Sequence, residues 1–221
     1  MKQIDKITEP DSLLQHRAKP SANFDNLPLA AKEELRQNLL SEQGHICCYC
    51  MKRIPEGCPP HMKVEHFKCQ ARFGELQLTY SNLLGACTGN EGQPKIKQTC
   101  DTKKGNKDLT INPVSTSPIC ETLFKYNAQG EISSIDNNAD INEQLNNVLN
   151  LNMQTLKDGR REIYLQVQER VRRESRKDKT SFVKFLEQER TKWLKRTDNK
   201  YRPYCCVAVY YLTKKIKRNQ N

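Results

Sequence analysis

Ten cysteines occur in this 221-residue chain, and their spacing constrains the fold more than any other feature of the sequence. Cys47 and Cys50 form a C-x-x-C pair, and Cys87 and Cys100 follow, thirteen positions apart. A C-x-x-C turn can present both sulfurs to one tetrahedral zinc ion. The insertion between Cys87 and Cys100 is polar and rich in turn formers, and closing such a loop costs little for each added residue. A C-x-x-C pair alone is weak evidence for zinc, but the sulfurs of Cys87 and Cys100 could still meet and form the second pair of a zinc site. Cys48 could in principle replace Cys47, although the C-x-x-C geometry favours Cys47.

The other cysteines and the distribution of apolar residues indicate in which cellular compartment the protein is found. Cys58, Cys69 and Cys120 look unpaired and are expected to be small buried hydrophobes. No apolar run of roughly 18 residues occurs, and the N-terminus lacks the apolar core of a secretory signal. We expect a cytoplasmic protein without membrane contact, where clustered cysteines more often bind metal than form disulfides. A redox role for the C-x-x-C pair is the weakest interpretation, because no βαβ unit surrounds Cys47.

Differences in composition and residue pattern divide the chain into three regions. Residues 1–45 form an N-terminal helical segment, residues 46–115 a module rich in cysteine and proline, and residues 116–221 a basic, mostly helical region that opens with a β-hairpin at LFKYNAQGEISSI. The middle region has few apolar runs, so a bound metal would supply the organisation that its side chains lack. The expected fold is mainly α, with a small α+β core flanked by helices and the hairpin.

Apolar periodicity predicts the helices. In the first region Leu29, Leu35, Leu39 and Leu40 fall near one face of a helix that ends at Gly44. In the third region Asp140 and Glu143 have capping-box spacing. The β-branched and aromatic side chains of residues 203–218 favour a strand. The proline at the start of this segment and the lysines at its end favour a helix, and we expect a buried helix. Apolar faces of two further basic helices are expected at Ile163, Val167 and Val171, and at Phe182, Phe185, Leu186, Trp193 and Leu194.

The formal net charge of +11 is unevenly placed. Residues 157–221 hold 20 Lys and Arg against 8 Asp and Glu, whereas the first 156 residues hold 17 against 18. A one-sided basic segment favours a polyanionic partner, through neutralisation of phosphates and release of counterions. Solvated faces of surface helices explain the same pattern equally well, so the charge alone does not decide between them.

A Glu-His pair lies between the two pairs of cysteines. Side chains alternate along a strand, so Glu65 and His66 need a twist or bulge at the strand end to serve one site. For hydrolysis of a phosphodiester, a neutral imidazole takes a proton from water, and a divalent cation stabilises the charge that grows on the phosphate. The side-chain carbonyl of Asn82 could orient the His66 ring. His45 and His61 are expected to be peripheral.

The joint spacing resembles the pattern of HNH nucleases. That pattern is a C-x-x-C pair, an acidic residue followed by His, an Asn with a cysteine five positions later, then a cysteine, a ligand residue and Lys-Gly. The resemblance covers roughly residues 45–110 and implies a ββα-metal motif. It implies Glu65 and Asp101 as ligands of the catalytic metal, His66 as the general base and Asn82 as the orienting amide. The remaining implied residues are the zinc ligands Cys47, Cys50, Cys87 and Cys100, and Lys103 and Lys104 near the phosphate of the nucleic acid.

Two positions depart from the usual HNH pattern. Glu65 stands where Asp is usual, and Asp101 stands where His or Asn is usual. Oxygen ligands at both positions suit Mg²⁺ or Mn²⁺ better than a softer ion.

A narrower resemblance covers most of the chain. The segments SEQGHICCYCMKRIP, KVEHF, LTYSNLLGACTGNEG and QTCDTKKGN look like the PtuB-type HNH nucleases of Septu and retron-associated anti-phage systems. The resemblance implies a partner ATPase of the ABC type, PtuA, and in retron-linked systems a reverse transcriptase with its DNA–RNA product. It also makes the helical C-terminal region the expected dock for the ATPase or for nucleic acid.

Two functions from different classes follow. The preferred one is a metal-dependent HNH endonuclease effector of an anti-phage system. Its default substrate is DNA, and RNA, including tRNA, remains open. The alternative is a zinc-stabilised adaptor for nucleic acid or protein without catalysis, which would be indifferent to Glu65, His66 and Asn82. The joint spacing of those three residues favours the nuclease.

Overall fold

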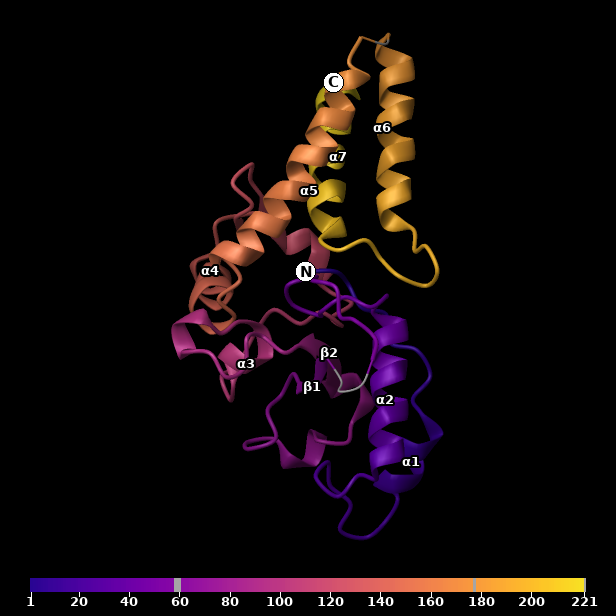
Figure 1. Cartoon of the computed structure of the whole chain (residues 1–221), viewed down its shortest axis with the longest axis vertical. Helices are drawn as coiled ribbons and strands as arrows, with labels where there is room; N and C mark the ends of the chain where they lie inside the picture. Colours follow the sequence, from indigo (N-terminus) through magenta and orange to yellow (C-terminus); the bar gives the residue numbers. More distant parts are fainter. Residues whose placement is uncertain (58–60, 177, 221) are drawn as a thin grey trace.

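The computed structural model describes residues 1–57, 61–176 and 178–220 and is mainly helical, with two small antiparallel hairpins (Figure 1). None of the helices in these ranges combines the length and the hydropathy that crossing a bilayer requires. In chain order the elements are α1 (Asp11–Arg17), α2 (Leu29–Glu42), β1 (Met62–His66), β2 (Leu83–Cys87), α3 (Cys100–Lys104), β3 (Phe124–Tyr126), β4 (Ile132–Ser134), α4 (Ala139–Glu143), α5 (Gln154–Arg173), α6 (Lys179–Leu194) and α7 (Cys205–Gln220).

Helix α2 covers one side of the lower half of the molecule. Leu35, Leu39 and Leu40 are buried, as their spacing predicted, but Leu29 is 77% exposed. Leu29 is the first residue of the helix, directly after Pro28, and lies beyond the part of α2 that contacts the core. The helix ends at Glu42, and Gly44 follows with a φ of +59°, in the conformation expected of a helix stop.

The β1–β2 hairpin lies between α2 and α3 (Figure 1). Its register pairs Met62 with Cys87 and continues without a bulge to His66 opposite Leu83. Of the twist or bulge expected at the end of β1, a bulge is absent from the described pairing. Strand β2 is almost fully buried because both of its faces are covered. A hairpin followed by the short helix α3 is consistent with the ββα arrangement of HNH proteins.

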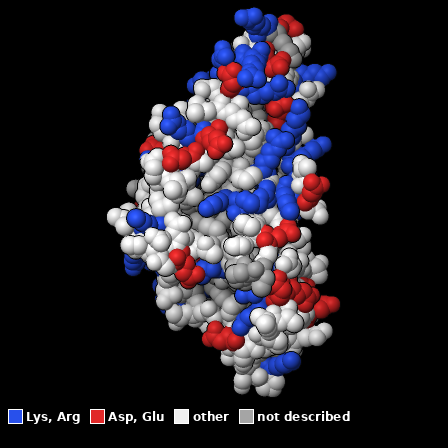
Figure 2. Space-filling model, viewed as in Figure 1, with Lys and Arg blue, Asp and Glu red and all other residues white. Residues whose placement is uncertain are grey.

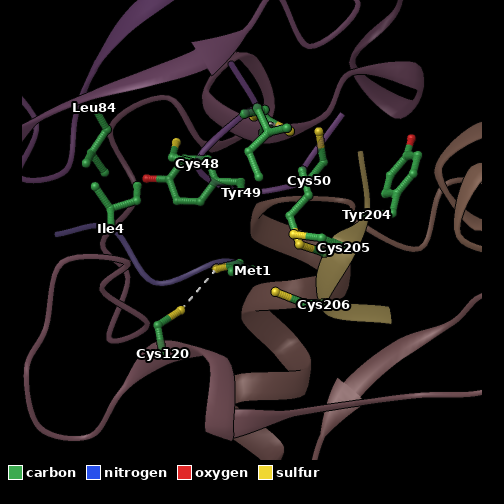
Figure 3. Close-up of a cluster of buried hydrophobic side chains, with 14 of the residues drawn as sticks. Met1, Ile4, Cys48, Tyr49, Cys50, Leu84, Cys120, Tyr204, Cys205 and Cys206 are labelled. Atoms are coloured by element: carbon green, nitrogen blue, oxygen red, sulfur yellow. Dashed lines mark hydrogen bonds between the residues drawn. The ribbon is translucent and has the colours of Figure 1, made fainter. Parts of the chain in front are cut away.

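The C-x-x-C turn is attached to the start of α7. The Tyr204 amide donates to the Met51 carbonyl at 3.1 Å, immediately before α7 begins. Figure 3 shows the buried side chains that fill this junction, many of which carry sulfur. Cys69 and Cys120 are buried as expected, and Cys58 lies outside the described residues.

The second hairpin and α4 follow the sequence pattern with one correction. Strands β3 and β4 pair around the turn predicted at LFKYNAQGEISSI. The cap of α4, however, is Asn138, whose side-chain oxygen accepts from the Ile141 amide at 3.0 Å. The capping-box assignment of Asp140 is therefore wrong: Asp140 lies within the first turn, because Asn138 caps the helix two residues earlier.

Helices α5, α6 and α7 pack together and form the upper part of the molecule (Figure 1). The predicted faces are largely correct: Val167, Val171, Phe185, Leu186 and Trp193 are buried, whereas Leu194, the last residue of α6, is 41% exposed. The ambiguous segment 203–218 is helical, as favoured, because its apolar side chains pack against α5 and α6. Lys and Arg side chains, with some Asp and Glu among them, gather over these helices (Figure 2).

Candidate active site

Four cysteines meet at one point beside the β1–β2 hairpin. The sulfurs of Cys47, Cys50, Cys87 and Cys100 all lie within 4.8 Å of one another. Three of the separations are 3.7 to 3.8 Å. Zinc–sulfur bonds of about 2.3 Å in a tetrahedron place the sulfurs about 3.8 Å apart, so the four residues fit a zinc ion. Cys48 is buried outside this group, as the C-x-x-C geometry favoured.

Local backbone conformation brings the four sulfurs together. Met51 has a φ of +63° directly after the C-x-x-C turn, and the Lys52 amide donates to the Cys50 sulfur at 3.4 Å. Cys87 is the last residue of β2, and Cys100 is the first of α3. The long insertion between them is closed at its base by a hydrogen bond from the Thr99 amide to the Gly89 carbonyl, 2.9 Å. The insertion therefore does not separate the second pair of ligands.

Glu65 lies at the centre of a buried polar group and is 2% exposed. One oxygen of its carboxylate accepts from the Tyr49 hydroxyl at 2.6 Å and lies 2.7 Å from the Lys104 ammonium. Burial raises the pKa of Glu65 well above its usual value, the neighbouring Asp101 carboxylate raises it further, and Lys104 opposes both. Glu65 and Asp101 thus lie close enough to interact strongly.

Asp101 reaches this group from the first turn of α3, with a side chain that is 16% exposed. One of its oxygens lies 3.4 Å from the ammonium of Lys63, which also contacts Glu91 at 3.1 Å. Two carboxylates that converge and interact strongly form an oxygen-donor pair of the kind that Mg²⁺ or Mn²⁺ prefers. The chemistry of the donors therefore fits a hard divalent cation.

His66 ends β1 with its ring almost buried, 7% exposed. Its Nε2 atom lies 3.0 Å from the Gln77 carbonyl, and the Phe24 ring meets it edge-on, with centroids 4.6 Å apart. A carbonyl can only accept, so Nε2 carries the proton and Nδ1 keeps its lone pair. Burial lowers the pKa of His66, while the Asp101 charge, close enough to act on the ring, raises it.

The structure corrects how Asn82 acts. Its side-chain oxygen accepts from the Lys68 amide at 2.7 Å, and its amide group donates to the carbonyls of Lys68 and Leu76 at 3.0 and 3.1 Å. The expected direct bond from the Asn82 side-chain carbonyl to the His66 ring is not among the contacts of the described residues. Asn82 instead pins the loop whose Gln77 carbonyl meets that ring, so any orienting effect on His66 is indirect.

Lys104 is also placed differently from the expectation. Its side chain is 1% exposed, and its ammonium donates to the His66 main-chain carbonyl at 3.0 Å in addition to its contact with Glu65. The expectation that Lys104 lies near a phosphate therefore concerns a buried ammonium that contacts Glu65, not a side chain in solvent. Lys103, on the outer face of α3, is partly exposed and bonds the Lys95 carbonyl at 2.8 Å.

Several residues of the site carry no signal in the sequence. Tyr49 and Lys63 contact the two carboxylates, Phe24 packs on the imidazole, and Gln77 acts through its backbone. Only Tyr49, enclosed by the C-x-x-C pair, could have been found from its position. His45, next to Glu56, and the exposed His61 take no part in the cysteine cluster, as expected.

Comparison with known proteins identifies relatives over about half of the chain. One, from Vibrio cholerae serotype O1 biovar El Tor, is named as an HNH endonuclease of retron Vc95 and is 33% identical over 105 residues, 46% of this chain and 47% of the relative. Another, named as an HNH endonuclease of retron Ec83 from Escherichia coli, is 28% identical over 122 residues, 48% of this chain and 46% of the relative.

A third relative is the Septu protein PtuB of Bacillus thuringiensis, 28% identical over 131 residues, 58% of this chain and 48% of the relative. No family model matches the chain. The similarity to retron and Septu HNH proteins is thus confirmed, and the chain spans about half the length of each of these relatives.

Proposed function

We propose that this protein is a metal-dependent HNH endonuclease that hydrolyses phosphodiester bonds as an effector of an anti-phage system. The observation that carries the proposal is the grouping of the buried Glu65, the partly buried Asp101 and the oriented His66 ring. Lys104 contacts both the Glu65 carboxylate and the His66 main chain, and the hairpin and helix that carry these residues also supply two of the four clustered cysteines. The names of the relatives support both the HNH class and the defence setting.

Each side chain has a defined task in the proposed reaction. Glu65 and Asp101 would hold a Mg²⁺ or Mn²⁺ ion, which when bound stabilises the charge that develops on the phosphate and the leaving oxygen. His66 takes a proton from the attacking water at Nδ1, because Nε2 is held by the Gln77 carbonyl. Lys104 and Tyr49 fix the Glu65 carboxylate, and Asn82 fixes the loop that orients the base.

The test is cleavage by the purified chain, with and without its partner ATPase, of duplex DNA, single-stranded DNA and total RNA in Mg²⁺ or Mn²⁺. His66→Ala should lower the rate by about 10²- to 10⁴-fold, the usual contribution of a general base, without changing zinc content or circular dichroism. His61→Ala, an exposed histidine at the entry to β1, should cleave as well as the wild type.

The same experiment separates the nuclease from the adaptor. An adaptor that binds nucleic acid or protein without chemistry would keep its full function after alanine substitution of Glu65, His66 or Asn82. Cleavage that survives His66→Ala undiminished would remove the nuclease assignment and leave the adaptor.

We extend the proposal to the partners. The retron and Septu names of the relatives support partners from such systems. From the resemblance of the sequence we propose an ABC-type ATPase of the PtuA kind and, in a retron setting, a reverse transcriptase with its DNA–RNA product. The docking surface proposed is the groove of about 320 Å³ between α5, α6 and α7, which includes Arg170, Arg173, Trp193 and Arg202. Arg173→Glu should weaken co-purification of the ATPase and leave the zinc content unchanged.

A further inference from the structure

The loop between the zinc ligands Cys87 and Cys100 is a firmly held structure. Gly89, with a φ of +57°, lies so near the Thr99 carbonyl that a Cβ would approach it to 2.2 Å, so the base of the loop requires glycine. The Asn90 side chain donates to the Lys97 carbonyl at 2.8 Å. The Asn150 side chain, from a distant segment, donates to the carbonyls of Ile96 and Gln98 at 3.0 and 2.9 Å. These contacts fix the tip of the loop, the turn Lys95–Lys97.

Helix α3 joins this tip to the candidate active site. The outer face of α3 holds the loop, because the Lys103 ammonium donates to the Lys95 carbonyl at 2.8 Å. The inner face of the same five-residue helix supplies Asp101 and Lys104 to the buried polar group. A groove of about 550 Å³ runs along the outer face, between Lys95, Lys103 and Lys107. One short helix therefore positions both the tip of the loop and Asp101.

The tip presents an apolar side chain between two cations. Ile96 is 79% exposed, the most exposed of the large hydrophobic side chains among the described residues, and Lys95 and Lys97 on either side are exposed too. Besides the buried Lys104, residues 93–107 hold four lysines and one acidic residue, Asp101, and the exposed Glu91 earlier in the loop is paired with Lys63. Single exposed hydrophobic side chains are common on protein surfaces. What distinguishes Ile96 is that it lies in a turn held by side-chain hydrogen bonds, directly between two exposed lysines.

The charge of the surroundings identifies the partner. Lysines on both sides of the tip and along the groove complement a phosphate backbone. One isoleucine offers far too little apolar area for a stable protein interface, which buries about 800 Å² on each partner. A single apolar side chain flanked by cations is instead the arrangement with which proteins enter a stack of bases and separate adjacent ones.

We propose that the Lys95–Lys97 turn is a nucleic-acid wedge, in which Ile96 inserts between stacked bases while Lys95 and Lys97 grip the flanking phosphates. The inference rests on the proposed nuclease function and names one element of its substrate site. The wedge would fix the nucleic acid along α3 and thereby place one phosphodiester at the carboxylates.

The test measures nucleic-acid binding by the chain carrying His66→Ala, so that the probe stays intact and the result does not depend on cleavage. The probes are a short DNA duplex, a DNA single strand and a structured RNA, each with 2-aminopurine in place of one adenine. Insertion of Ile96 should unstack the fluorescent base and raise its emission when the protein binds. Ile96→Ser should abolish the rise, whereas Leu29→Ser, with a nearly equal exposure of 77% on α2, should preserve it.

The grip on phosphate is measured by the salt dependence of binding. Lys97→Gln should weaken binding by about threefold to tenfold and lower the slope of log affinity against log salt by about one. Lys19→Gln, an exposed lysine next to α1, should leave both quantities unchanged.

The possible outcomes test the wedge and the nuclease assignment separately. An unchanged rise in emission with Ile96→Ser, or an unchanged salt slope with Lys97→Gln, overturns the wedge even if His66 proves essential for cleavage. Loss of partner ATPase binding by Ile96→Ser with normal nucleic-acid binding overturns it as well and makes the tip a protein contact. If the chain with His66 intact shows no cleavage, but Ile96→Ser still abolishes the rise in 2-aminopurine emission, the wedge is supported and only the nuclease assignment is removed.

Discussion

The region around β1, β2 and α3 and the helices α5 to α7 share one hydrophobic core but differ in the polar groups that they bury. Among the described residues of α5, α6 and α7, Arg160 is the only polar or charged side chain that is buried, and the interior is otherwise apolar. The β1–β2–α3 region instead buries Glu65, His66, Asn82 and Lys104. Burying such groups is costly, and four converging sulfurs are the feature of the region that can offset the cost.

This contrast shows which part of such a chain can hold reactive side chains. An apolar helical interior excludes water and charges, so it provides a rigid support without reactive groups. A small metal-held region can keep carboxylates, an imidazole and an ammonium side by side because its backbone does not depend on apolar packing alone.

Loss of zinc should have the largest effect. Structural zinc contributes about 10 to 16 kcal/mol in small zinc-folded peptides. A zinc-selective chelator, or Cys100→Ser, should therefore remove hydrogen-exchange protection from β1, β2 and α3 while α5 to α7 stay protected. Cys69→Ser changes a buried cysteine outside the quartet and should keep the zinc. Equal loss of protection in all the helices would show that the two regions do not differ in what holds them.

Lys104→Met should destabilise the same region by about 3 to 5 kcal/mol, because it leaves the Glu65 carboxylate buried without its cation. Lys103→Met, at the neighbouring and partly exposed position, should cost less than about 1 kcal/mol. Urea unfolding followed by exchange in β1 and α3 measures both. A similar cost for the two variants would mean that the buried ion pair has no structural importance.

Leu186→Ala should destabilise the helical side by about 2 to 5 kcal/mol, since Leu186 is fully buried in α6. The single tryptophan, Trp193, lies on the same helix, so its fluorescence reports the unfolding of that side directly. Zinc content should not change. If it falls, the helices support the cysteine cluster and the independence of the two sides is disproved.

The smallest effect is expected at α4, between the two sides. Asn138→Ala should cost about 1 kcal/mol by removing the cap of α4, and Asp140→Ala should change stability by less than about 0.5 kcal/mol. Thermal unfolding of both variants compares them. A larger effect at Asp140 would restore the capping-box assignment that the geometry contradicts.

The sequence predicted those features that depend on spacing. The four cysteines follow from their joint spacing and the second hairpin from a local pattern, and the structure contains both. The C-terminal segment fitted a strand as well as a helix, and packing against α5 and α6 accounts for the helix. The sequence could not predict the burial of Lys104, because a five-residue helix does not show which face turns inward. The Gln77 carbonyl that bonds His66 is a backbone atom, which no residue type reveals. Phe24 reaches the same ring from a segment far away in the chain.

The positions of Cys87 and Cys100 have a consequence for how this loop can vary. Their sulfurs lie 3.7 Å apart, so both ends of the loop belong to one ion-binding group whatever the loop contains. Apart from the base formed by Gly89 and Thr99, we expect that residues of the loop can be added, removed or exchanged without moving Asp101, which follows Cys100 directly. Contacts with the target could therefore diversify by changes in loop length and sequence while the groups that perform the chemistry keep their geometry.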